Sequence, residues 1–294
     1  MKILLAIVHH WNPDGGGRHQ SLRPDPQPRL YALQDQLLAL RRLGVYQGTL
    51  DIDQRLVTPS NQAIRHTFDI HLITDGQHTV LDRLEPLYRD MVKEIVTEPE
   101  TARHLGFEAQ KHLASQLDGN YDLYGYLEDD LLIQDPYFFH KIHWFTNQMG
   151  AECLLLPHRM ELWRTPDQVD KFYIDGPVTE SDLAHLIPQP ATPVAAGLPV
   201  GQVIFESPKN PHSGCFFLTR DQLQDWKNHP SWQDGDCSYV SPLESAATLG
   251  LTKMFKLYKP AIINAGWLEI QHWGSSFRSL IGGVIGEGST SDPC

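Results

Sequence analysis

The sequence predicts an α/β protein whose open, mostly parallel sheet is flanked by helices. A continuous apolar run at residues 2–8 and two further segments, "FDIHLITDG" at 68–76 and "MVKEIVTE" at 91–98, each predict a buried strand. Continuous apolar runs are typical of parallel strands, because helices cover both faces of such a sheet. Together with the helical segments below, they give the order strand, helix, strand, strand, helix, strand, which favours an open parallel sheet.

The composition is that of a globular protein, with 294 residues, 41% of them hydrophobic and 20% charged. This length suffices for one large domain or two small ones. The net charge of −12 argues against nucleic-acid binding through a broad basic surface. Four widely spaced cysteines form no zinc or disulfide pattern, which favours a reducing compartment. No segment is long and apolar enough to span a membrane, so we expect a cytoplasmic protein that is able to act at a membrane surface.

The first helix has clear start and end signals. Asp25 is the expected N-cap, Pro26 the first helical residue, and Gly44 a typical C-terminal signal. A helical repeat between them places four leucines on one face, which are Leu30, Leu33, Leu37 and Leu40. A second helix, from about residue 102 to 117, repeats this pattern and leads to a strand in "YDLYGYL".

Three adjacent carboxylates, Glu128, Asp129 and Asp130, follow that strand inside the apolar run "YGYLEDDLLI". Adjacent like charges repel, and burying one of them without a partner is costly. Ligands of open α/β sheets bind beyond the carboxyl ends of the strands, where these acids lie. The sequence therefore predicts a divalent cation here, although a solvated strand end or a helix N-cap would also explain the acids.

The second half of the chain has a different character. "LLLPHRMELW" predicts a strand that runs into a loop, and residues 175–202, rich in Pro, Gly, Ala and Thr, predict an irregular segment. "SGCFFLT" predicts a strand, followed by a helix with a capping box between Thr219 and Gln222. A helix in "SPLESAATLGL" and a strand in "KMFKLYKPAIINA" follow, and the Gly/Ser-rich end from Gly282 predicts disorder.

In the order of these parts, the chain resembles nucleotide-sugar-dependent glycosyltransferases of the GT-A class. "YLEDD" looks like the family's DxD-like metal motif, and "DIHLITDG" looks like its second strand, whose terminal acid often contacts the base. The resemblance covers residues 1–275 as one domain, with a nucleotide-sugar-binding half at 1–135 and an acceptor-side half at 136–275. Residues 276–294 would then form a flexible tail.

This resemblance implies a metal-dependent transfer of a sugar from a nucleoside-diphosphate donor to a hydroxyl acceptor, such as a glycan or a lipid-linked glycan, with Mn²⁺ or Mg²⁺ as cofactor. Asp130 would be the direct metal ligand, while Glu128 and Asp129 would contact ribose or metal-bound water. His272, in "WLEIQHWGSS", resembles the late histidine that adds a metal ligand in many family members. Packing beside a tryptophan would explain the same histidine without a metal.

Glu244 matches the position of the carboxylate base in family members that invert the sugar's configuration. Ser241 and Glu244 also fit a capping box, with Pro242 at the first helical position, which needs no catalysis. A retaining enzyme would not need such a base.

Further candidates flank these acids. The loop "GGGRHQ" suits either phosphate binding by backbone amides or plain flexibility, and "TDG" suits either a base contact or an ordinary turn. The nucleotide-side candidates in these segments are His9, His10, Arg18 and Asp75. The acceptor-side candidates, from "LLLPHRMELW" and "KNPHSGCFF", are His158, Arg159, Glu161 and His212.

Two other functions share most of these features. A sugar nucleotidyltransferase uses a similar sheet and paired acids with Mg²⁺, and a nucleotide-binding relative without activity would keep only the donor site. The products separate the two enzymes, because sugar transfer releases a nucleoside diphosphate and nucleotidyl transfer releases pyrophosphate. A metal-dependent hydrolase is disfavoured, since "VHHW" supplies neither HxH nor HxxxH spacing.

Overall fold

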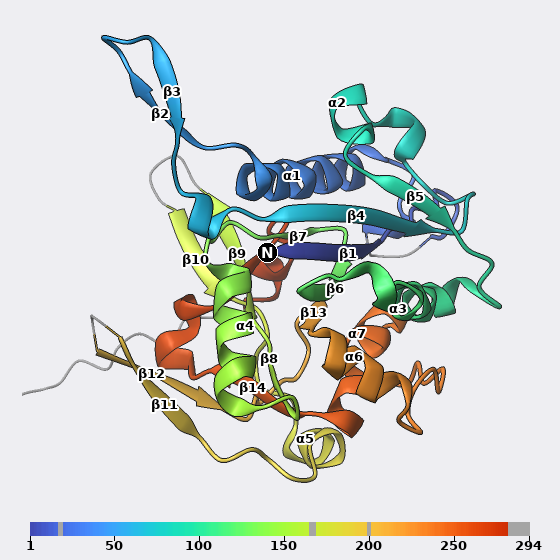
Figure 1. Ribbon diagram of the computed structural model, residues 1–294. Helices are drawn as coiled ribbons and strands as arrows, with labels where there is room; N and C mark the ends of the chain where they lie inside the picture. The colour runs from blue at the N-terminus through green and yellow to red at the C-terminus, as the bar shows by residue number, and fades with distance from the viewer. Residues whose placement is uncertain (17–19, 165–168, 199–200, 282–294) are drawn as a thin grey trace, which may run out of the picture.

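The structure is a computed structural model, and it describes residues 1–16, 20–164, 169–198 and 201–281. Its centre is a five-stranded sheet in the order β13-β6-β1-β4-β5 (Figure 1). These strands are β1 (Lys2–Val8), β4 (Thr67–Thr74), β5 (Lys93–Val96), β6 (Leu123–Glu128) and β13 (Cys215–Leu218). The pairs among β5, β4, β1 and β6 are parallel, and β13 pairs antiparallel with β6. The predicted mostly parallel α/β sheet is confirmed.

Helices cover both faces of this sheet, as the apolar strands require. α1 (Gln27–Gly44) packs on one face, and α3 (Leu105–Ser115) packs on the other together with α6 (Arg220–Lys227) and α7 (Pro242–Met254) (Figure 1). Alternate residues of β1 point to the two faces, with Ile3, Leu5 and Ile7 toward α1 and Leu4, Ala6 and Val8 toward α3.

Helix ends differ slightly from the prediction. α1 begins at Gln27 rather than Pro26, and the Asp25 carboxylate accepts a hydrogen bond from the Gln27 amide at 3.0 Å. The helix predicted over 102–117 consists of a 3-10 turn, α3 and a second 3-10 turn. Terminal turns often tighten in this way, because their backbone groups lack intrahelical partners.

The strand register brings three carboxyl ends to one edge of the sheet. Val8, the last residue of β1, pairs with Ile73 of β4 on one side and with Glu128 of β6 on the other. The segments that follow these three strands therefore lie side by side. They carry five of the predicted site residues, which are His9, His10, Asp75, Asp129 and Asp130.

Two four-stranded sheets build the second half, in the orders β10-β9-β15-β7 and β11-β12-β14-β8. Their strands are β7 (Leu131–Leu132), β8 (Cys153–Leu155), β9 (His158–Arg164), β10 (Val169–Tyr173), β11 (Val194–Leu198), β12 (Gly201–Glu206), β14 (Lys256–Pro260) and β15 (Glu269–His272). Because β7 directly follows the acidic segment, the first of these sheets adjoins the carboxyl end of β6.

Two predictions for the second half are wrong. "LLLPHRMELW" forms two strands, β8 and the first part of β9, rather than one strand and a loop. The segment 175–202 is not irregular, since it contains α5 (Glu180–Leu186), β11 and the start of β12. α5 has a proper N-cap, because the Thr179 hydroxyl accepts the Asp182 amide at 3.2 Å, and the surrounding Pro and Gly residues obscured this signal.

The remaining elements are α2 (Pro86–Arg89), α4 (Phe138–Met149) and a hairpin of β2 (Gly48–Asp51) and β3 (Leu56–Pro59) that projects from the body (Figure 1). Part of the predicted tail forms a 3-10 turn, Ser276–Leu280, while 282–294 lie outside the described residues. Over the part of the chain that is described, no helix combines the length and apolarity that crossing a bilayer requires.

Candidate functional site

The acidic segment diverges into three different surroundings. Glu128 is the last residue of β6, and Asp129 and Asp130 form the turn before β7. All three lie in a largely buried region at the edge where the strand ends meet. Their different partners indicate different roles.

Asp129 is satisfied by the protein itself. One carboxylate oxygen lies 2.6 Å from Nδ1 of buried His9, and the other accepts a hydrogen bond from Arg29 in the first turn of α1. Nε2 of His9 accepts the Val80 amide at 3.1 Å, so the His9 proton lies on Nδ1 and donates to Asp129. Asp129 and His9 therefore hold the strand ends together, and a direct contact of either residue with a nucleotide stays a prediction.

Asp130 is only partly satisfied. Its Oδ2 accepts a hydrogen bond from Arg29 at 3.2 Å and lies 3.7 Å from Nε2 of His272 on β15. Its Oδ1 is buried and has no hydrogen-bond partner among the described residues. Burial alone would raise the pKa of Asp130, but His272 and Arg29 outweigh burial and hold that pKa below its usual range. The carboxylate is thus ionised with one oxygen unused.

His272 is held in place from its other side. Its Nδ1 lies 3.0 Å from Oε1 of buried Glu161 on β9, and Glu161 also accepts the Phe277 amide at 3.1 Å. This arrangement directs Nε2 of His272 toward Asp130. Burial would lower the pKa of His272, but Asp130 and Glu161 raise it above its ordinary value. The structure thus brings Asp130 and His272 together, and their role as metal ligands stays a prediction.

Glu128 differs from Asp130 because its pKa is raised, whereas that of Asp130 is lowered. Burial, together with repulsion from Asp130, raises the pKa of Glu128 to about 8. Among the described residues its carboxylate has no hydrogen bond or close ion pair, although Arg159 partly opposes the shift. Gly214 leaves room for it, because a Cβ there would lie 2.7 Å from Oε2 of Glu128 and its φ of +64° suits glycine. A cation near Glu128 would favour its ionised form.

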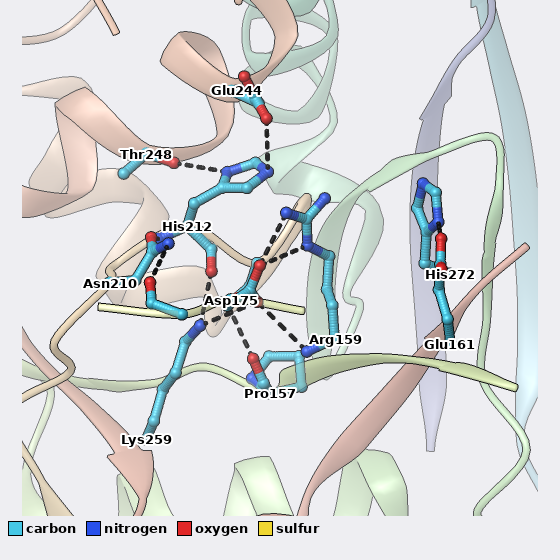
Figure 2. A network of polar contacts seen from close by, with 12 residues as sticks. Pro157, Arg159, Glu161, Asp175, Asn210, His212, Glu244, Thr248, Lys259 and His272 are labelled. Atoms are coloured by element: carbon cyan, nitrogen blue, oxygen red, sulfur yellow. Dashed lines mark hydrogen bonds and ion pairs between the residues drawn. The ribbon is translucent and has the colours of Figure 1, made fainter. Parts of the chain in front are cut away.

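A buried cluster of charged residues from the second half of the chain, Arg159, Asp175 and Lys259, has all its charges paired (Figure 2). Arg159 on β9 contacts Asp175 through two nitrogens, at 2.9 and 2.7 Å, and Lys259 on β14 lies 3.3 Å from the same carboxylate. Nζ of Lys259 also donates to the His212 carbonyl at 2.5 Å. Burial would raise the pKa of Asp175, but Lys259 and Arg159 hold it far below its usual range.

Glu244 and His212 form a second incomplete pair. Oε1 of Glu244, in the first turn of α7, lies 3.8 Å from Nε2 of His212, whose Nδ1 lies 3.0 Å from the Thr248 hydroxyl. Oε2 of Glu244 and Nε2 of His212 are buried without hydrogen-bond partners among the described residues. Burial lowers the pKa of His212 well below its ordinary value, so its imidazole is neutral at pH 7.

Of the capping box predicted for Ser241 and Glu244, the structure forms only the N-cap hydrogen bond. Ser241 accepts the Glu244 amide at 3.3 Å, as an N-cap should. The Glu244 side chain, however, turns toward His212 instead of completing a capping box (Figure 2). Figure 2 also shows Arg159 between the His212–Glu244 pair and the Glu161–His272 pair, and its charge acts on both Glu128 and Glu244.

The remaining predicted site residues lie in different places. Nε2 of His158 donates to the Pro260 carbonyl at 2.6 Å and so joins β9 to β14 rather than facing the acids. His10 and Asp75 lie together where β1 and β4 end, with Oδ2 of Asp75 3.8 Å from Nδ1 of His10. Arg18 lies outside the described residues.

Comparisons with known proteins give loose structural likenesses alone. No family model and no curated protein matches the chain. Among solved structures, the chain is similar to mannose-1-phosphate geranyltransferase from Thermus thermophilus, at 12% identity and a TM-score of 0.39 over 88% of this chain and 73% of that one. It is also similar to HddC from Yersinia pseudotuberculosis complexed with GMP-PN, at 13% identity and a TM-score of 0.35 over 88% and 90%. Such loose likenesses carry no function across, so the chemistry rests on this chain's own residues.

Sequence reasoning missed four residues of this region: Arg29, His78, Asp175 and Lys259. Arg29 and Lys259 are far along the chain from the acids they contact, and no local pattern marks such a pairing. Asp175 lay in a segment that we predicted to be irregular. His78 alone carried a local signal, since it follows Asp75 by three residues in "DGQH".

Proposed function

We propose that this chain is a metal-dependent glycosyltransferase that moves a sugar from a nucleoside-diphosphate donor to a hydroxyl acceptor, a glycan or a glycolipid. One observation carries the proposal: two incompletely partnered acids, Asp130 facing His272 and Glu244 facing His212, border the same electrostatically connected cluster. The first pair suits a cation with its diphosphate, and the second suits a hydroxyl group. The GT-A resemblance of the acidic segment supports the same function.

On the donor side, Asp130 and His272 would hold Mn²⁺ or Mg²⁺. Metal–ligand bonds of about 2.0–2.2 Å allow two ligand atoms to be up to about 4.4 Å apart, and the 3.7 Å between Oδ2 and Nε2 fits this limit. The cation would neutralise charge on the departing diphosphate, and an imidazole ligand favours Mn²⁺. Glu161 fixes the imidazole through Nδ1, and Arg29 orients the Asp130 carboxylate.

The remaining donor-side residues have different roles in this proposal, either contacting the ligand or positioning residues that do. Glu128 would contact the cation or its water, because it is buried close to Asp130 and has no partner of its own among the described residues. His9 and Asp129 satisfy each other, so they position the acidic turn. His10 and Asp75 lie together where β1 and β4 end, and their contact with the nucleoside stays a prediction.

On the acceptor side, Glu244 takes the proton from the attacking hydroxyl through Oε2. Neutral His212 lies against Oε1, and the positive charge of Arg159 acts on the same carboxylate. A positioned base of this kind contributes about 100- to 10,000-fold in rate. Transfer assisted by such a base would invert the anomeric configuration.

The product test separates this proposal from nucleotidyl transfer, which would use the same cation and acids. The chain is incubated with Mn²⁺ and a panel of nucleotide sugars and saccharide acceptors, and in parallel with nucleoside triphosphates and sugar 1-phosphates. We expect a free nucleoside diphosphate and a glycosylated acceptor from one donor, and loss of both products in Asp130→Asn. Pyrophosphate from the parallel reactions, without any diphosphate release, would overturn sugar transfer in favour of nucleotidyl transfer.

A further inference from the structure

A second group of metal-ligating side chains lies away from Asp130, where β1 and β4 end. His10 follows β1 by two residues, Asp75 directly follows β4, and His78 lies three residues farther on. Among the residues that the structure describes, these three form the group whose ligand atoms, all within 4.8 Å of one another, are close enough to share one cation. This group is separate from Asp130 and His272, which lie beyond β6.

The backbone holds these three side chains in place. Oδ1 of Asp75 accepts the amides of Gln77 and His78, at 3.0 and 2.8 Å, which closes the turn. The Trp11 amide donates to the His78 carbonyl at 2.8 Å and ties this turn to the segment after β1. The other oxygen of Asp75, Oδ2, is therefore directed toward the two imidazoles, and a cation bound there would leave the backbone hydrogen bonds of Oδ1 intact.

The distances approach those of a coordination sphere. Oδ2 of Asp75 lies 2.7 Å from Nδ1 of His78 and 3.8 Å from Nδ1 of His10. Ligand atoms around a tetrahedral ion with bonds of about 2.0–2.1 Å are separated by roughly 3.4 Å, so shifts of under about 1 Å in those two separations are sufficient. Nδ1 of His10 is buried and has no hydrogen-bond partner among the described residues, although a polar nitrogen in that position normally has one.

We propose that His10, Asp75 and His78 form a binding site for a transition-metal cation, with Zn²⁺ as the best-suited ion. Two imidazoles and one carboxylate match the ligands that Zn²⁺ takes, whereas Mg²⁺ and Ca²⁺ prefer oxygen ligands. Nearby His9 does not complete the set, because its two ring nitrogens contact Asp129 and Val80. The fourth position is left for water or an oxygen atom of a bound molecule.

This site does not depend on the proposed transferase activity, and its test needs no substrate. The full chain is stripped of metal with a chelator and titrated with Co²⁺, whose visible absorption reports imidazole and carboxylate ligation, and then with Zn²⁺ by calorimetry. The variants are His78→Ala, the matched control His185→Ala, which removes an exposed histidine of α5, and Asp130→Asn.

We expect one tight equivalent of Zn²⁺, which displaces Co²⁺, in the native chain and in both His185→Ala and Asp130→Asn. The Zn²⁺ affinity should fall by at least about 100-fold in His78→Ala. Removing a residue that only hydrogen-bonds a metal ligand already lowers metal affinity by about 10- to 100-fold, and removing the ligand itself should lower it further. Melting of each metal-free variant confirms that it is folded. Equal Zn²⁺ affinity in native and His78→Ala chains, or a loss of the tight equivalent in Asp130→Asn alone, would overturn the proposal.

Discussion

Two buried charged clusters in this molecule have opposite properties. Around Asp175, both oxygens face cations, Arg159 and Lys259, and the pKa of the carboxyl is held far below its usual range. Around Glu128, the carboxylate has no close partner among the described residues, and burial with repulsion from Asp130 raises its pKa to about 8. The first cluster is complete without a ligand, and the second is not.

This difference separates stability from function. A complete buried ion cluster holds elements of the fold in place, because removing one member leaves an unpaired buried charge. An incomplete cluster persists when a ligand supplies the missing charge or hydrogen bond. The incomplete cluster around Glu128 also contains three buried atoms without hydrogen-bond partners among the described residues: Oδ1 of Asp130, Oε2 of Glu244 and Nε2 of His212. These atoms motivate the proposed donor and acceptor sites.

The largest expected effect tests the complete cluster. Asp175→Asn leaves Arg159 and Lys259 buried without their counter-charge, and we expect it to lower the free energy of unfolding by about 3–5 kcal/mol. The measurement is denaturant unfolding followed by circular dichroism. The matched control, Asp82→Asn, removes an exposed carboxylate with side-chain exposure of 77%, and should stay within about 0.5 kcal/mol of the native chain. A loss below about 1 kcal/mol in Asp175→Asn would contradict the structural role of this cluster.

The next effect tests the incomplete cluster on the acceptor side. Glu244→Gln should reduce kcat by about 100-fold or more, because an amide does not accept the hydroxyl proton, while stability changes little. Ser241→Ala is the control that separates base from cap. It removes the N-cap and should lower stability by about 1 kcal/mol with kcat retained. If Glu244→Gln retains full activity, Glu244 is not the base.

A smaller effect concerns the support of the proposed metal ligand. Glu161→Gln keeps an oxygen that accepts the Nδ1 proton of His272 but removes the negative charge. We expect activity to require about tenfold more Mn²⁺, since partners of metal ligands tune affinity by about 10- to 100-fold. The midpoint of a Mn²⁺ titration measures this, with kcat at saturating Mn²⁺ as the control. An unchanged midpoint would exclude Glu161 from the metal site.

The smallest effect involves neither cluster. His66 is buried, and burial lowers the pKa of His66 to about 4, with His140 adding repulsion. Because the unfolded chain binds a proton near the ordinary histidine pKa of 6.5, the stabilising contribution of His66 is present above that pH and is lost as pH falls toward 4. Between about pH 7 and pH 5.5 we expect about 1 kcal/mol lower stability from this group. His66→Gln should reduce that pH dependence, and an unchanged dependence would contradict the shift.

Much of the fold follows from local patterns in the sequence, and much of the site does not. The apolar runs of β1, β4 and β6 and the amphipathic α1 predicted the central sheet, because burial imposes a repeat on neighbouring residues. The same logic located the acidic segment at a strand end. The partners that distinguish Asp129 from Asp130 are His9 and His272, about 120 and 140 residues away in the chain, and only tertiary packing brings them together.

The proposed donor site is tested most directly by thermal unfolding with each nucleoside diphosphate, with and without Mn²⁺, in the native chain and in Asp130→Ala. At about a hundred times its dissociation constant, a ligand stabilises the fold by about 2.7 kcal/mol. We expect a Mn²⁺-dependent rise in melting temperature with one nucleotide, absent in Asp130→Ala. No rise with any nucleotide, or the same rise in Asp130→Ala, would contradict a donor site at the end of β6.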